Sequence, residues 1–264
     1  MTRAQTHFLF LNIGHLLDHL FTLIFATVAA LALSREWGMS YAQLIPYATP
    51  GFIAFGVFAL PAGWLADRWS RKGMIAVFFV GIGLASIATG YARSPLEIGV
   101  GLFVVGIFAA IYHPVGLALV TDETKGMGLA IAQNGVWGNL GVGCAALLTG
   151  YFIDHGGWRT AFIWPGILSI LVGLAYLRHI WPDLAAERAL RPAIAAARTA
   201  KSAQSSDQRA LLIRLTAIIF FTTAVSSIIF QSTTFALPKV FDERLKGIAG
   251  SATLIGWLAF LVFA

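Results

Sequence analysis

The first apolar segment of the sequence carries a row of polar side chains that can exchange protons. His15, Asp18 and His19 stand close together, and Asn12 and Thr22 continue the row on either side. Intervals of three to four residues place all five on one face of a helix. A carboxylate beside imidazoles suits proton transfer near neutral pH, because histidine titrates in that range.

Two interpretations of this row remain open. In a membrane, an ionisable side chain costs about 2.5–3.5 kcal/mol or more at the centre of a helix, so it faces water or a partner. The row then either handles protons and solute or joins helices through hydrogen bonds. We expect Asp18 to couple proton movement, with His15 and His19 assisting.

Further polar residues lie in the later apolar segments. Tyr112, His113 and Pro114 follow one another, and the proline removes a backbone donor, so this turn either lines a cavity or only bends a helix. Hydrogen bonding between helices is the competing role for the amide side chains. The candidate substrate-binding residues are Asn12, Tyr112, His113, Gln133, Asn134 and Gln231.

Composition identifies the elements that must position these residues. The chain has 264 residues, of which 58% are hydrophobic and 11% charged, whereas soluble domains carry about 25% charged residues. Such a chain is expected to be an all-α polytopic membrane protein. Glycines in the fifth segment, Gly135, Gly138, Gly141 and Gly143, are expected to allow close helix contact. The predicted spans are 8–33, 43–66, 74–92, 96–120, 127–153, 159–180, 211–237 and 249–264.

Basic residues predict the orientation, because lysine and arginine are retained in the cytoplasm. With the N-terminus inside, the cytoplasmic loops hold Arg68, Arg71, Lys72, Lys125 and the basic residues between 178 and 214. The opposite side of the first six spans holds only Arg35, Arg93 and Arg159. We therefore expect a multi-pass protein of the cell inner membrane with a cytoplasmic N-terminus.

A change in composition divides the chain into three parts. Residues 1–180 form a bundle of six predicted spans, and 181–210 are rich in alanine, arginine and serine, which predicts a cytoplasmic linker that is partly helical. Residues 211–264 begin a second bundle. The last segment is still apolar where the sequence stops, which we interpret as a truncation.

The loop between the second and third spans contains a motif that carries charge of both signs. It reads Gly63-Trp-Leu-Ala-Asp67-Arg68-Trp-Ser-Arg71-Lys72. It resembles the Gly-x-x-x-Asp-Arg-x-Gly-Arg-Lys signature of the major facilitator superfamily, with Ser70 in place of a glycine. The resemblance implies that Gly63, Asp67, Arg68, Arg71 and Lys72 control conformational gating, and that Asp67 braces helices of the second half.

Three further stretches resemble the fosmidomycin-resistance branch of that superfamily. They are Gly14-His-Leu-Leu-Asp-His19, Val105-Gly106 through Tyr112-His-Pro114, and Gly128-Leu-Ala130 through Gly138-Asn-Leu-Gly141. The resemblance implies two six-helix bundles that rock around a central site. It also implies proton-driven efflux of a drug or metabolite by an antiporter.

These features together predict a proton-coupled secondary transporter that acts as a monomer. Its expected partners are a small-molecule substrate, protons and the lipid bilayer, with no nucleic acid, no metal and no cofactor. ATP-driven transport is not expected, because the Walker A spacing is absent. Two alternatives remain: an intramembrane metal-dependent enzyme, for which His15, Asp18, His19 and His113 would supply ligands, or a truncated fragment without transport activity.

Overall fold

The computed structural model describes residues 1–122, 126–200 and 206–263, and nearly all of them are helical. Lys125 and Lys201, both expected in the cytoplasm, lie outside these residues. In the described part of the chain, seven helices are long and apolar enough to cross a membrane, and Ala252–Phe263 is a shorter apolar helix. The predicted all-α membrane fold is therefore confirmed.

Residues 3–122 form four of these long helices. The first consists of α1, η1 and α2 in succession, the second of α3, η2 and α4, and the fourth of α6 followed by η3 and α7. Their bounds are α1 (Arg3–Val28), η1 (Ala29–Leu33), α2 (Ser34–Glu36), α3 (Tyr41–Leu44), η2 (Ile45–Ala48), α4 (Thr49–Arg68), α5 (Arg71–Gly90), α6 (Pro95–Ala109), η3 (Tyr112–Gly116) and α7 (Leu117–Asp122).

The remaining elements are α8 (Met127–Gly156), α9 (Trp158–Ala200), α10 (Ser206–Arg244) and α11 (Ala252–Phe263). Because α9 continues to Ala200, residues 181–200 of the predicted linker extend the sixth span as a helix. Each predicted span corresponds to one of these helices, although the first begins at Arg3 rather than at residue 8.

Glycines allow several of these helices to approach at backbone distance. A Cβ on Gly141 of α8 would lie 2.2 Å from the carbonyl oxygen of Leu16 in α1, and one on Gly138 would lie 2.7 Å from the His15 ring. Gly143 faces Phe260 of α11 at 3.1 Å. The predicted packing role is thus confirmed for these three. It is wrong for Gly135, because none of the described residues lies within 4 Å of the place where its Cβ would stand.

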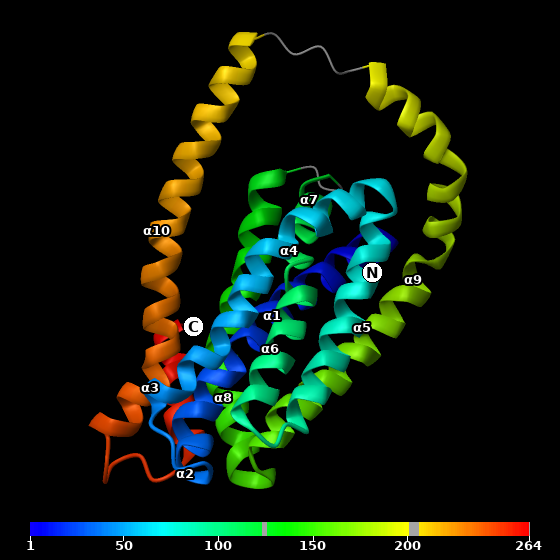
Figure 1. The fold of residues 1–264 in the computed structure, drawn as a ribbon. Helices are drawn as coiled ribbons and strands as arrows, with labels where there is room; N and C mark the ends of the chain where they lie inside the picture. Colours follow the sequence, from blue (N-terminus) through cyan, green and yellow to red (C-terminus); the bar gives the residue numbers. More distant parts are fainter. Residues whose placement is uncertain (123–125, 201–205, 264) are drawn as a thin grey trace.

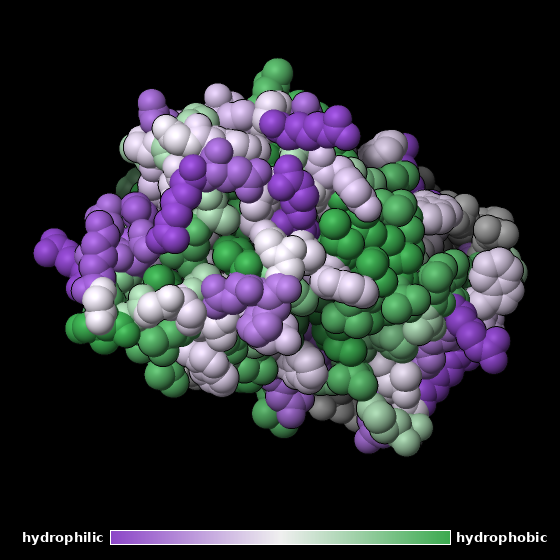
Figure 2. All heavy atoms as spheres, turned by 90° about the horizontal axis from the view of Figure 1, so that it is seen from below, coloured by the Kyte–Doolittle hydropathy of each residue, from purple (hydrophilic) through white to green (hydrophobic). Residues whose placement is uncertain are grey.

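α10 and α11, which begin the predicted second bundle and are called the second half below, meet the first six spans in different ways. α11 packs along α8, where a Cβ on Gly150 would lie 2.2 Å from the carbonyl oxygen of Ala252, whereas α10 meets the bundle near α3. Figure 1 shows α10 close to the bundle beside α3 and standing away from it at the opposite end. Near α3, the hydroxyl of Tyr41 donates to the carbonyl of Phe235 at 2.5 Å, and Arg35 pairs with Asp242 at 3.6 Å. We call this the α3 end. Seen from below in Figure 2, hydrophilic side chains cover much of this end, with hydrophobic surface beside them.

Candidate proton and solute site

The polar row of α1 meets a distorted turn of the fourth span. Tyr112-His113-Pro114 lies in η3, a π-helical turn, and proline favours such a distortion because it lacks the backbone N–H. His113 Nε2 lies 3.3 Å from Asp18 Oδ2. Asp18 is only 1% exposed, and among the described residues its other oxygen has no hydrogen-bond partner.

The two histidines of α1 are joined to each other and to α8. His15 Nδ1 lies 2.8 Å from the backbone oxygen of Asn134. A carbonyl only accepts, so Nδ1 carries the hydrogen and Nε2 of a neutral His15 is an acceptor. His19 Nε2 lies 3.2 Å from that atom and must donate to it. The two rings therefore form a short hydrogen-bonded chain.

The ring of His113 closes this cluster from the side of η3. It stands edge-on to His15, with centroids 5.4 Å apart, and edge-on to His19 at 5.5 Å. One ring nitrogen of each histidine lies within 4.8 Å of the others, so these three are the described residues that could hold a metal. Both nitrogens of His15 are already engaged in hydrogen bonds, which favours a hydrogen-bonded cluster.

Three of the predicted substrate residues bond to one another inside the bundle. The side-chain amide of Asn134 donates to Asn12 Oδ1 at 2.9 Å and to the Tyr112 hydroxyl at 3.0 Å. Tyr112 in turn donates to the backbone oxygen of Leu11 at 2.7 Å. All three side chains are buried. In this conformation they join α1, η3 and α8.

The other two predicted substrate residues lie apart from the cluster. Gln133 is exposed on α8. With Asn12 it lines an open hollow of about 940 Å³, whose remaining walls are Met1, Gln5, Phe8, Leu9, Val136 and Trp137. Gln231 is half-buried on α10, one helical turn before Phe235. The structure therefore places Gln133 beside an open space and Gln231 on the second half.

An apolar pocket that the sequence analysis missed lies beside the histidine cluster. It lies between α1, α4, α6 and α10, is partly open to its surroundings, and has a cavity volume of about 20 Å³, which is room for about one water molecule. Phe55 of this pocket stands edge-on to His113, with centroids 5.7 Å apart. The three-residue spacing of Phe52 and Phe55 was a sequence pattern that could have indicated this pocket, but phenylalanines are common throughout the chain. The lining residues are Phe21, Thr22, Phe25, Ala48, Gly51, Phe52, Phe55, Leu102, Val105, Gly106 and Phe235.

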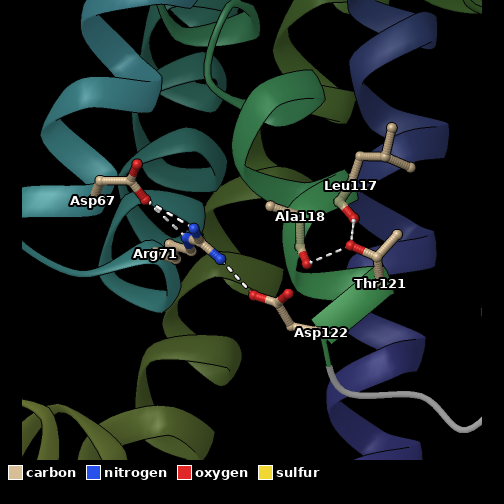
Figure 3. A network of polar contacts seen from close by, with 6 residues as sticks. All are labelled: Asp67, Arg71, Leu117, Ala118, Thr121 and Asp122. Carbon is tan, nitrogen blue, oxygen red and sulfur yellow. Dashed lines mark hydrogen bonds and ion pairs between the residues drawn. The ribbon is translucent and has the colours of Figure 1, made fainter. Parts of the chain in front are cut away.

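The charged motif forms a separate network at the opposite end of the bundle from α3. Arg71 donates to Asp67 Oδ1 from Nε at 3.0 Å and from Nη2 at 2.9 Å. Its Nη1 contacts Asp122 at the end of α7 (Figure 3). The resemblance implied that Asp67 braces the second half, but this contact connects it, through Arg71, with α7 of the first half. Asp122 was not predicted.

The rest of the motif ties this loop to α9. Lys72 pairs with Asp183 at 3.0 Å, and Arg3 pairs with the same carboxylate at 2.6 Å. Ser70, which replaces a glycine, adopts an extended conformation with φ −167° and caps α5. No glycine is needed there, since only a positive φ would require one.

The two other motif residues contact apolar side chains. The guanidinium of Arg68 lies 4.2 Å from the ring centroid of Trp64, and a Cβ on Gly63 would meet Pro114 at 3.5 Å. Gly63 therefore brings α4 near the η3 turn, whereas the Arg68 side chain packs on Trp64 of the same helix.

Comparison with known proteins identifies relatives over part of their length. The gallate transporter of Pseudomonas putida is 31% identical over 172 residues, which are 63% of this chain and 38% of that protein. The niacin transporter NiaP of Acinetobacter baylyi is 30% identical, over 61% of this chain and 37% of that protein. The tetracenomycin C resistance and export protein of Streptomyces glaucescens is 30% identical, over 61% and 30%. The chain thus spans well under half of these relatives.

A solved structure shares the fold. The bacterial homologue of the human lysosomal transporter Spinster superposes with a TM-score of 0.57 at 20% identity, covering 68% of this chain and 43% of that one. The sequence model described as Major Facilitator Superfamily matches residues 11–264. This agrees with the expectation that the chain is not an enzyme. On this evidence the chain belongs to the Major Facilitator Superfamily.

Proposed function

We propose that the intact protein is a proton-coupled secondary transporter that exports a small organic solute across the cell inner membrane. The observation that carries the proposal is the buried contact between Asp18 and His113. An unpaired carboxylate inside a membrane-spanning helix costs several kcal/mol, so a buried aspartate there needs a partner or a function that offsets this cost. Protonation of Asp18 removes its charge and weakens its attraction to His113. Proton binding can thereby change how α1 and η3 are held together.

The hydrogen-bonded histidines supply a route toward this carboxylate. His19 and His15 are linked nitrogen to nitrogen, and both rings stand against His113, which contacts Asp18. Imidazole accepts a proton at one nitrogen and releases one from the other. The cluster is therefore suited to moving a proton between the surroundings of the three histidines and Asp18. A role limited to holding helices together would need no ionisable side chain.

Alternating access is supported by the way the halves meet. They contact each other along α8 and α11 and at the α3 end, through Tyr41 with Phe235 and Arg35 with Asp242. None of the most apolar part of α10 is buried, and its other end stands away from the bundle. With the N-terminus in the cytoplasm, as the basic residues predict, this is an inward-facing conformation. Rocking of the two bundles would then close this open end and open the α3 end.

Export is the direction that the sequence resemblance favours. The relatives include a protein named for resistance to and export of tetracenomycin C, and a puromycin resistance protein of Streptomyces alboniger. Others are named only as transporters of gallate or niacin. These names support a small organic solute. Its exchange for protons is what the resemblance to the fosmidomycin-resistance branch implies.

The test is solute flux in vesicles that contain the intact protein, with and without an imposed pH gradient. Asp18→Asn keeps the size and hydrogen bonding of the side chain but cannot carry a proton. We expect gradient-driven accumulation to disappear while downhill exchange persists. Asp18→Glu is the matched control, because it restores a carboxyl group and should retain part of the coupling. Accumulation by Asp18→Asn with the pH dependence of the wild type would refute the proposal.

A further inference from the structure

The apolar pocket beside the histidine cluster lies between the two halves of the chain. Phe52 of α4 and Phe235 of α10 face each other across it, with ring centroids 5.3 Å apart and planes inclined by 69°. This is the edge-to-face arrangement that aromatic rings favour. Tyr41 holds the backbone oxygen of Phe235, so the position of this residue in α10 is fixed relative to the first half.

One wall of the pocket is rigid because two helices touch at their backbones. A Cβ on Gly106 of α6 would lie 2.1 Å from the carbonyl oxygen of Gly51 in α4. A Cβ on Gly51 would lie 2.8 Å from the carbonyl oxygen of Leu102. These helices cannot approach further, and the pocket-lining side chains that flank the contact, among them Phe52, Phe55 and Leu102, are apolar.

The pocket has one polar side, toward the histidine cluster. Thr22, its only hydroxyl-bearing side chain among the lining residues, donates to the backbone oxygen of His19 at 3.0 Å. Phe55 lies between the pocket and the ring of His113. A molecule with an apolar ring and one polar substituent can therefore place the ring among phenylalanines and the substituent beside Thr22, with Phe55 separating it from His113.

We propose that this pocket binds a small solute with a single aromatic ring, which inserts between Phe52 and Phe235. The inference rests on the proposed transport function and names the class of solute. Insertion replaces a contact between the two halves with two contacts to the solute, so occupancy affects how the halves are held together. Because the two rings are in contact and one wall of the pocket is rigid, the rings must separate to admit even a single ring, and this selects against fused, multi-ring molecules.

Equilibrium binding to the intact protein in lipid nanodiscs, without any gradient, tests this proposal. Two pairs of probes differ only in ring type: benzoate with cyclohexanecarboxylate, and benzylamine with cyclohexylmethylamine. We expect saturable binding of the aromatic member of at least one pair, about 2- to 10-fold tighter than its saturated analogue. Equal affinities within both pairs, or no saturable binding of either aromatic probe, would overturn the proposal.

Three substitutions locate the binding. Phe52→Leu and Phe235→Leu should each remove the preference for the aromatic probe. Phe58→Leu is the matched control, because Phe58 lies on the same helix as Phe52 but pairs with Phe103 outside the pocket. An equal loss in Phe58→Leu would move the site elsewhere. Binding is measured without flux, so an aromatic preference with no pH-driven transport would contradict the proposed function alone.

Discussion

His113 Nε2 lies 3.3 Å from Asp18 Oδ2 and thereby joins a π-helical turn to the middle of the first span. The contact is asymmetric, because the side chain of Asp18 is 1% exposed and that of His113 is 42% exposed. Under the proposed coupling, a proton that approaches Asp18 from the exposed side of the contact would meet His113 first. Because His113 is the exposed member of the pair, its side chain can be substituted without disrupting the packing of the core.

His113→Gln should impair coupling more than folding. Glutamine can still donate a hydrogen bond to Asp18, but it cannot carry a proton. We expect reduced accumulation under a pH gradient and a changed pH dependence of flux, with normal amounts of protein in the membrane. His155→Gln provides the control, since His155 is exposed and bonds only the carbonyl of Tyr151 one turn earlier. Wild-type pH dependence in His113→Gln would show that this imidazole has no part in coupling.

Tyr112→Phe should lower stability. The hydroxyl donates to Leu11 and accepts from Asn134, and its loss leaves both buried groups with fewer partners. The expected cost is about 1–3 kcal/mol, measured as a lower Tm in detergent. Tyr151→Phe changes an exposed tyrosine on α8 and should leave the Tm unchanged. An unaltered Tm in Tyr112→Phe would mean that water replaces the missing hydroxyl.

Gly141→Ala and Gly135→Ala form a matched pair in one helix. Both substitutions raise helix propensity by about 1 kcal/mol. A methyl group on Gly141 would lie 2.2 Å from the Leu16 carbonyl, whereas one on Gly135 meets open space. Gly141→Ala should therefore destabilise by about 1–3 kcal/mol, and Gly135→Ala should be neutral or stabilising. Equal melting temperatures for the two variants would contradict the close contact of α1 with α8.

Arg71→Lys should slow transport with little effect on stability. Arginine contacts Asp67 and Asp122 at once, and lysine is a point charge that cannot reproduce this fork. Because these pairs are partly exposed, the change in stability should stay within about 1 kcal/mol. Initial flux rates and thermal denaturation measure the two effects. Arg68→Lys, which alters only the contact with Trp64, should be the milder change; a larger defect there would argue against the Asp67–Arg71–Asp122 network.

The orientation can be tested with reporter fusions. Fusions at Arg93, Lys125 and Lys201 should report outside, inside and inside, because the basic residues follow that pattern. A periplasmic signal at Lys201 would exclude the arrangement of six spans followed by a cytoplasmic connection.

Periodicity in the sequence was enough to place Asn12, His15 and Asp18 on one face of a helix. It could not identify His113 as the partner of Asp18, since that depends on the π-helical turn and on which helices pack together. Asp122 and Asp183 were missed because charged residues at helix ends usually face water. Gly135 was misassigned because glycine spacing does not say which faces of a helix meet a neighbour.

The carboxylate of Asp183 forms ion pairs with both Arg3 and Lys72. Asp183 lies in the part of α9 that leads toward the second half. This one carboxylate thus links three segments, namely the start of the chain, the loop after the second span and the connection between the halves. A rotation of this part of α9 cannot leave both cations in place. Affinity tags fused before Met1 would lie close to these ion pairs, so purification handles are better placed away from the N-terminus.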